Sequence, residues 1–210
     1  MKYLKLFMFL ALVALISNSS YAQEAGKISD GGKNMTTLNE TIKIIHQRKS
    51  VRHFMDKAVT KEQLEAIVRA GMAAPTAINT QPWQFLVVTD KELKAKYAEG
   101  NRQAEMINKC SALVIICGDM NIGSERSQAF WVQDVSAATE NLLLAVESLG
   151  LGAVWTGVYP IEERVKEVKE KFGLPEKVIP LCVVLVGYPE GDIDQPKDKW
   201  KPERLHWNQY

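Results

Sequence analysis

Positive charge is concentrated in one short segment, RKSVRHF at residues 48–54, where Arg48, Lys49 and Arg52 surround Ser50. Guanidinium groups are permanently charged, forked donors and a serine hydroxyl adds a neutral donor, so the set suits a phosphate monoester. If the segment is extended, residues 48, 50 and 52 point to the same side. A solvated basic turn is the alternative, since the carbonyl groups of a preceding helix C-terminus favour one or two of these cations.

Two further segments could complete a ligand site. In APTAINTQPWQF, residues 74–85, Asn79 and Gln81 carry amides that donate and accept in one plane, as the edge of a heteroaromatic ring requires. In VWTGVYP, residues 154–160, Gly157 ends an expected strand where the backbone could approach a flat ligand closely. Turn geometry alone explains the first segment, and a bulge or strand end explains the second, so both alternatives stay open.

The C-terminal segment KWKPERLHW, residues 199–207, adds Lys201 and Arg204 to a polar, proline-bearing tail without a hydrophobic period. Ordinary surface charge is the simplest explanation of these two residues when the segment is taken alone. The tail is therefore a candidate part of the site only in combination with the other three segments.

Several familiar chemistries are excluded by inspection. There is no GxSxG nucleophile elbow and no GxxxxGK[ST] phosphate loop, and GLGAVW at residues 150–155 lacks the third glycine of a dinucleotide fingerprint. No CxxC is present, and His46, His53 and His206 lack the spacing of metal ligands. No pair of carboxylates stands out for acid–base work, so the chemistry is expected to come from a cofactor.

Three cysteines, Cys110, Cys117 and Cys182, lie in apolar surroundings within KCSALVIIC and PLCVVLV. Cysteines of exported proteins often pair, and an odd number leaves at least one free. Their surroundings favour a simpler interpretation, in which all three are small apolar residues of buried strands.

The N-terminus has the pattern of a secretory signal peptide. Lys2 and Lys5 precede an apolar run over residues 6–16, and small polar residues follow, which predicts cleavage before Gln23. A membrane anchor is the alternative, but a spanning helix needs about 20 apolar residues and this run has eleven. The sequence therefore predicts an exported, periplasmic protein.

Cleavage would remove two lysines and no acids, leaving 24 basic against 25 acidic residues, a net charge of −1. That balance argues against nonspecific nucleic-acid binding and makes the cluster at residues 48–52 a local feature. Residues 23–36 are polar and glycine-containing, which predicts a flexible lead. Residues 37–210 are expected to form one domain, long enough to bury a full core.

Helices and strands alternate irregularly along this domain. Capping boxes at Thr37–Glu40 and Thr60–Gln63 open two of the expected helices. The irregular order favours an α+β sheet with helices on both faces over regular βαβ repetition. Helices are expected over residues 38–47, 61–72, 90–100, 132–149 and 161–173, and strands over residues 84–90, 111–119, 152–160 and 179–189.

The helix over residues 132–149 is alanine-rich and apolar on nearly every side. Val135, Leu142, Val146 and Leu149 form its main stripe, and Gly150 is placed to end it in the left-handed conformation. Such a helix is expected to be buried on most sides, and a subunit interface is one way to bury it.

Together these segments resemble the nitroreductase family of FMN-dependent oxidoreductases. RKSVRHF is similar to the family's R-x-S-x-R opening, and APTAINTQPWQF to its P-[ST]-x-x-N-x-Q-P-W turn. NLLLAVESLGLGAVWTGVYP resembles its central helix and the following strand, whose end meets the flavin. The likeness runs in order from about Leu38 to Arg204.

The resemblance implies a central, mostly antiparallel sheet flanked by helices, and an intertwined homodimer with two FMN sites, each built from both chains. By this resemblance, the ribityl phosphate is contacted by Arg48, Lys49, Ser50 and Arg52, and by Arg204. The turn of the other subunit that flanks the ring consists of Pro75, Thr76, Ala77, Ile78 and Asn79. Polar contacts to the ring come from Asn79 and Gln81, and the backbone of Thr156 and Gly157 lies near flavin N5.

The implied activity is an FMN-dependent oxidation of NADH or NADPH, followed by reduction of an electron-poor acceptor such as a nitroaromatic or a quinone. Acceptor choice is expected to lie in residues 97–131, where Tyr97, Phe130 and Trp131 are candidate lid aromatics or core residues. The same motifs also fit a dehalogenating or flavin-cleaving relative, or an exported electron-transfer protein without NAD(P)H turnover.

Two residues depart from this pattern. Thr76 stands where the family commonly has serine, and Ile78 stands where glycine is frequent. The bulkier side chain of Ile78 is expected to narrow the ring pocket. Export also conflicts with NAD(P)H as reductant, because these nucleotides are cytoplasmic. Either another reductant or an envelope redox partner serves the protein, or the expected export is wrong.

Overall fold

The computed structural model describes residues 39–191 and 195–210, so the expected signal peptide and lead lie outside the described residues. The chain divides into two units, residues 1–45 and 46–210, and each is described by itself. Helix α2 (Glu40–Gln47) begins after Asn39, whose Oδ1 accepts from the Ile42 N–H at 3.0 Å. Asn39 thus caps the described helix, and the predicted capping residue Thr37 lies outside the described residues.

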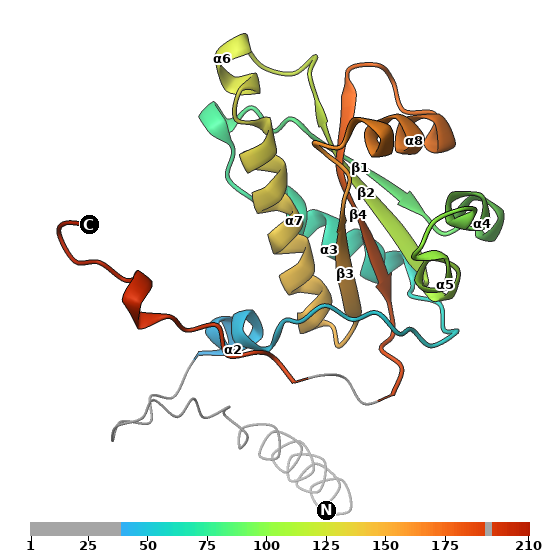
Figure 1. Cartoon of the computed structure of the whole chain (residues 1–210), viewed down its shortest axis with the longest axis horizontal. Helices are drawn as coiled ribbons and strands as arrows, with labels where there is room; N and C mark the ends of the chain where they lie inside the picture. Colours follow the sequence, from blue (N-terminus) through green and yellow to red (C-terminus); the bar gives the residue numbers. More distant parts are fainter. Residues whose placement is uncertain (1–38, 192–194) are drawn as a thin grey trace, which may run out of the picture. The chain divides into compact units, whose positions relative to one another are not determined.

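The unit of residues 46–210 is built around one antiparallel sheet (Figure 1). Its order is β1-β2-β4-β3, and each neighbouring pair runs antiparallel. The two central strands are the most deeply buried, and the α+β class with an antiparallel sheet is confirmed. The strands are β1 (Trp83–Val88), β2 (Ala112–Asp119), β3 (Gly152–Gly157) and β4 (Val178–Gly187).

One face of the sheet is covered by α3 (Lys61–Met72) and α7 (Trp131–Ser148). Alternate residues of β2, including Val114 and Ile116, point to this face because side chains of a strand alternate. The Thr60 capping box is present, so the predicted start of α3 is confirmed. Helix α7 buries Leu142 and Val146 against the sheet, while its remaining sides are half-buried or exposed in the chain.

The other face is covered by α4 (Lys91–Ala98), α5 (Ala104–Lys109) and α8 (Glu162–Phe172), with Leu113 and Ile115 of β2 pointing to it (Figure 1). Helix α5 was not predicted, and neither was α6 over residues 125–128. Both are shorter than two turns, so neither carries enough of a hydrophobic period to be recognised.

The three cysteines are buried and unpaired, which confirms the prediction that they pack as small apolar residues. Burial raises the thiol pKa of Cys110 to about 11 and of Cys117 and Cys182 to about 12. All three therefore stay protonated and unreactive at neutral pH. Within the described residues no cluster of histidine, cysteine or acidic side chains could hold a metal ion.

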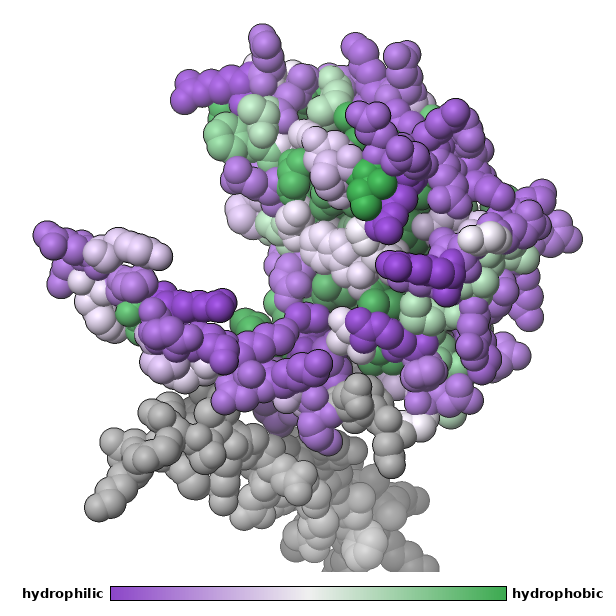
Figure 2. Space-filling view, in the orientation of Figure 1, coloured by the Kyte–Doolittle hydropathy of each residue, from purple (hydrophilic) through white to green (hydrophobic). Residues whose placement is uncertain are grey.

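The C-terminal residues 195–210 contain one short 3₁₀ helix, η2 (Pro202–Arg204), and are almost wholly exposed. Trp200 and Trp207 expose 63% and 78% of their surface. Figure 2 shows hydrophilic side chains predominating on the face drawn, with hydrophobic patches between them. Across the part of the chain that is described, no helix is long and apolar enough to span a bilayer.

Candidate functional site

The basic segment runs along the outer edge of β3. Ser50 forms a parallel bridge with Ala153, and the Val51 N–H donates to the Ala153 carbonyl at 2.9 Å. Val51 is buried, whereas Ser50 and Arg52 on either side of it are exposed. The segment therefore pairs with β3 at Ser50, and the Ser50 hydroxyl and the Arg52 guanidinium group are left exposed on either side of Val51.

The remaining two cations of the segment already have carboxylate partners. Arg48 Nε lies 3.0 Å from Glu140 Oε1, and Lys49 Nζ lies 4.0 Å from Glu147 Oε1. Burial raises the pKa of Glu147, and the charges of Lys49 and Arg48 oppose that rise. The predicted cluster is thus divided: two cations are partly neutralised by α7, while Ser50 and Arg52 have no partner among the described residues.

The segment after α3 forms a tight turn with η1 (Ala77–Asn79) at its centre. Ile78, Asn79 and Gln81 have φ values of 55°, 56° and 53°, in the left-handed region. This conformation is strained for a β-branched residue, and it explains why glycine suits position 78. Ile78 is also 74% exposed, so strain and an unburied apolar side chain coincide at one residue, which is typical of functional sites.

Side chains hold this turn from inside. The Gln81 N–H donates to Thr76 Oγ1 at 3.1 Å, and Gln81 Nε2 donates to Asn79 Oδ1 at 3.0 Å. Threonine at position 76 therefore keeps the acceptor that a serine would provide. The paired amides leave Asn79 Nδ2 and Gln81 Oε1 available for a ligand, in agreement with their predicted polar role.

Asp134, in the first turn of α7, ties the turn to the core across 57 residues of sequence. Its Oδ1 accepts from the Ala77 N–H at 2.9 Å. The side chain is buried, and Oδ2 has no hydrogen-bond partner among the described residues. Sequence reasoning missed this residue, although an acid inside an apolar helix is a signal that could have found it.

The end of β3 opens into a hollow of about 490 Å³. Thr156 Oγ1 donates to the Val183 carbonyl at 2.6 Å, so this hydroxyl has no proton left to donate to a ligand. Gly157 is exposed, and a Cβ at this position would meet no atom within 4 Å. The hollow is also lined by Arg102 and Gln103, which fall within the range expected to determine acceptor choice but were not singled out from the sequence.

Of the expected lid aromatics, two have core contacts. Tyr97 is buried with its ring 5.2 Å from that of Phe172, although it also lines the hollow. Trp131 is buried and stacks edge-on with Tyr159 at 4.9 Å. Of these three aromatic residues only Phe130 is exposed, at 43%. Core packing therefore explains the position of Trp131, and most of the contacts of Tyr97.

The structure does not bring all predicted site residues together within one chain. The turn at residues 75–81 precedes β1, whereas Ser50 and Gly157 lie at β3, on the opposite edge of the four-stranded sheet. Three strand spacings separate these edges, about 14 Å. Arg204 is exposed in η2, and no hydrogen bond or ion pair in the described residues joins it to the basic segment.

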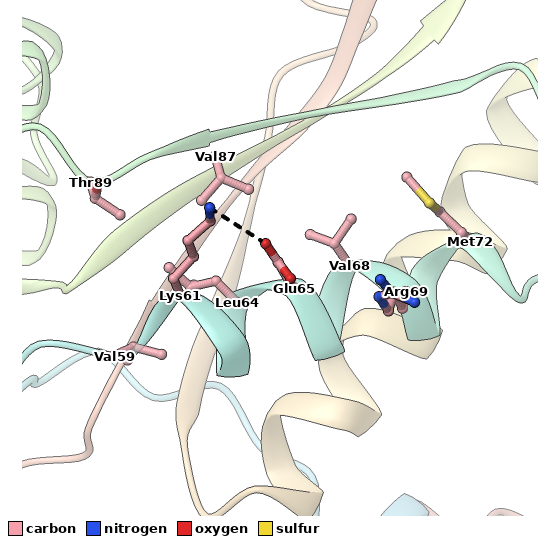
Figure 3. Close-up of a pocket in the computed structure, with 9 residues that line it drawn as sticks. All are labelled: Val59, Lys61, Leu64, Glu65, Val68, Arg69, Met72, Val87 and Thr89. Atoms are coloured by element: carbon pink, nitrogen blue, oxygen red, sulfur yellow. Dashed lines mark ion pairs between the residues drawn. The ribbon is translucent and has the colours of Figure 1, made fainter.

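A larger groove of about 840 Å³ runs between α3 and the free edge of β1 (Figure 3). Leu64, Val68, Met72 and Val87 line it, and the charged groups near it include Lys61, whose Nζ lies 3.8 Å from Glu65. The groove is mainly apolar and lies at the far edge of the sheet from β3. It is a surface for packing rather than for chemistry.

Comparison with known proteins identifies this arrangement. The sequence model of the Nitroreductase family matches residues 45–105 and 99–188, well over half of the chain. The chain belongs to the nitroreductase family. The matched nitroreductase ranges include the basic segment, the turn and the end of β3, but they stop before Arg204.

Individual nitroreductases resemble the chain over most of its length. An Archaeoglobus fulgidus protein with the provisional name NADH dehydrogenase/NAD(P)H nitroreductase is 43% identical over 171 residues, covering 80% of this chain and 98% of its own. A Parabacteroides distasonis crystal structure with the same provisional name shares 42% identity, a TM-score of 0.76, and 82% and 100% coverage. A Desulfovibrio desulfuricans nitroreductase in complex with FMN shares 26% identity, a TM-score of 0.69, and 83% and 99% coverage.

Proposed function

We propose that the protein is an FMN-dependent NAD(P)H oxidoreductase with its flavin along the outer edge of β3. The observation that carries the proposal is the position of the basic segment on that edge. Ser50 lies beside Ala153, and Gly157 follows four residues later, about 13 Å along the strand. A phosphate at Ser50 and a ring near Gly157 would then share one strand edge.

The residues present fit this cofactor. Ser50 and Arg52 offer exposed donors without partners among the described residues, as a phosphate requires. The open Gly157 allows a flat ring to approach the backbone, and the adjoining hollow is polar enough to take the ring edge. Arg48 and Lys49 would add positive charge near the phosphate, and their ion pairs with Glu140 and Glu147 would reduce that charge.

Bound FMN would supply hydride transfer, with NADH or NADPH as the donor and an electron-poor molecule as the acceptor. For a quinone the overall balance is NAD(P)H + H⁺ + quinone giving NAD(P)⁺ and hydroquinone. The chain's own groups would bind and orient the reactants. A nitroaromatic or quinone acceptor is part of the proposal.

We also propose that the active form is a homodimer. The turn at residues 75–81 lies too far from β3 of its own chain to flank the same ring, so a second copy must supply it. The free β1 edge with its apolar groove and the exposed aromatic tail at residues 195–210 are unburied surfaces that association would cover. Arg204 of the tail would then complete the phosphate site.

Export through cleavage before Gln23 is a separate proposal, supported by the signal-peptide pattern of residues 1–22. N-terminal sequencing of protein recovered from a periplasmic extract tests it. A mature chain that begins at Gln23 supports export, whereas an intact N-terminus in the cytoplasmic fraction contradicts it.

The visible spectrum of the purified protein, before and after anaerobic addition of NADH or NADPH, tests the enzymatic proposal. A bound flavin that bleaches on addition supports NAD(P)H oxidation. A flavin that stays oxidised favours the alternative of an electron-transfer protein served by another donor. A colourless protein that cannot be reconstituted with FMN contradicts the proposal.

Replacing Arg52 with alanine is expected to weaken FMN binding while leaving the fold intact. A charge-assisted contact contributes about 1.5–3 kcal/mol, so affinity should fall roughly ten- to a hundredfold. Fluorescence titration of the apoprotein with FMN measures the effect. Arg126→Ala, at another exposed arginine, is the matched control, and equal affinities of both variants would contradict the phosphate assignment.

Replacing Gly157 with alanine is expected to weaken FMN binding without changing the stability of the apoprotein. A Cβ at this position meets no atom within 4 Å, so the stability of the apoprotein should change by less than about 0.5 kcal/mol. If the flavin ring packs on this backbone, the added methyl group should weaken FMN binding by about 1–3 kcal/mol. Urea unfolding of the apoprotein and FMN titration measure the two terms, and undiminished FMN affinity would place the ring elsewhere.

A further inference from the structure

The hollow at the end of β3 contains two guanidinium groups that the proposed flavin site does not use. Arg102 lies in the loop between α4 and α5, and Arg164 lies in the first turn of α8. Arg164 Nη1 donates to the Gly157 carbonyl at 3.0 Å, which occupies one side of this group. Arg102 is exposed and has no hydrogen-bond or ion-pair partner through its side chain among the described residues.

The backbone on both sides of Arg102 is held in place. Asn101 Oδ1 accepts from the Gln103 N–H at 2.9 Å, and the Asn101 carbonyl accepts from the Ala104 N–H at 3.0 Å. The Asn101 N–H in turn donates to the Ala98 carbonyl at the end of α4. Arg102 is therefore carried at the tip of a defined turn, so its guanidinium group samples a restricted region at the hollow.

The charges around the hollow leave it positive. Glu167 is the only acid among its lining residues, against the two arginines. Burial, followed by the charge of Glu167, raises the pKa of Tyr97 to about 12, so this phenol stays neutral at physiological pH. An arginine fork without a carboxylate partner is suited to an anionic oxygen group, which it can bind through two parallel hydrogen bonds.

We propose that Arg102 is a specificity-determining residue that binds an anionic oxygen group on the ligand entering beside Gly157. The proposal rests on the proposed function, because Gly157 marks the ring position there. Two ligands could bring such a group: an aromatic acceptor with a carboxylate, or a nicotinamide nucleotide with a 2′-phosphate. Both satisfy the same guanidinium chemistry, and separate titrations distinguish them.

Binding of unreactive ligands to the FMN-loaded protein tests the proposal without turnover. Benzoate is compared with benzamide, and NADP⁺ with NAD⁺, by isothermal calorimetry and by perturbation of the flavin absorbance. In at least one pair the protein is expected to prefer the member with the additional anionic group, benzoate or NADP⁺, by about ten- to a hundredfold. The pair that shows the preference identifies the source of the anionic group.

Three variants determine whether Arg102 carries that preference. Arg102→Met should abolish it, Arg102→Lys should retain part of it, and Arg126→Met, at an exposed arginine of α6, should leave it unchanged. A preference that survives in Arg102→Met, or no preference in the unaltered protein, overturns the proposal. Loss of FMN from Arg102→Met alone also overturns it, by placing Arg102 in the flavin site. Failure of the proposed function appears differently, as an unaltered protein that binds no FMN.

Discussion

Replacing Asp134 with alanine is expected to destabilise the protein by about 1–3 kcal/mol and to weaken FMN binding in the same variant. The change removes the only acceptor of the Ala77 N–H among the described residues, and a part-buried donor left without a partner carries a cost of this size. The turn that loses this contact holds Ile78 and Asn79 in the left-handed region. Without its tie to α7, the strained turn should relax toward other conformations.

Asp134→Asn is the matched variant, because its side-chain carbonyl can still accept from Ala77. If holding the turn is the function of Asp134, asparagine should restore both stability and FMN affinity to nearly their original values. If Oδ2, unpartnered among the described residues, instead accepts from a second copy or from a ligand, asparagine presents a donor there and FMN affinity stays low. Urea unfolding and FMN titration measure both quantities, and an alanine variant as stable as the original would contradict the positioning role.

The elements with a strong local signal were predictable from the sequence. The capping box at Thr60 and the apolar stripe of residues 132–149 mark α3 and α7 because a helix is determined largely by neighbours within four residues. The antiparallel pairing of four strands followed only from the family resemblance, because pairing depends on contacts that are distant along the chain.

The sequence indicated candidate residues for the site but not their pairings. The basic segment lies beside β3 at Ser50, yet the partners of Arg48 and Lys49 are Glu140 and Glu147, about ninety or more residues away. These two acids are seven residues apart, two helical turns, and so lie on one side of α7. No pattern in residues 48–54 could reveal that these cations pair with acids of α7. The hydrogen bond between Asp134 and Ala77 was unpredictable for the same reason.

The left-handed conformation at position 78 was hidden for a different reason. Isoleucine rarely adopts a positive φ, so propensity argues against the observed turn. Tertiary contacts override that preference, since the residue before Ile78 is tied to Asp134 and the residues after it are closed by Thr76. Disagreement between local propensity and structure is expected at functional positions.

Replacing Gly152 with alanine is expected to cost about 1–3 kcal/mol of stability and to displace the basic segment from β3. A Cβ at position 152 would lie 2.7–2.9 Å from three side-chain atoms of Val51, closer than packed atoms can approach. Val51 is buried and β-branched, so it cannot turn aside within its rotamers. The backbone of residues 50–52 must move instead, which shifts Ser50 and Arg52 away from their positions on the strand edge.

Val51→Ala in the same chain should relieve part of this overlap, because it removes the two γ-methyl groups and leaves only Cβ, 2.8 Å from the new methyl group. A double-mutant cycle on stability should therefore show a favourable coupling of more than about 0.5 kcal/mol between positions 51 and 152. FMN affinity should fall in Gly152→Ala and recover in part in the double variant, since the hydroxyl and guanidinium groups return toward the edge. Additive effects on stability, or an unaltered FMN affinity in Gly152→Ala, would show that the phosphate site does not depend on the packing of Val51 against Gly152.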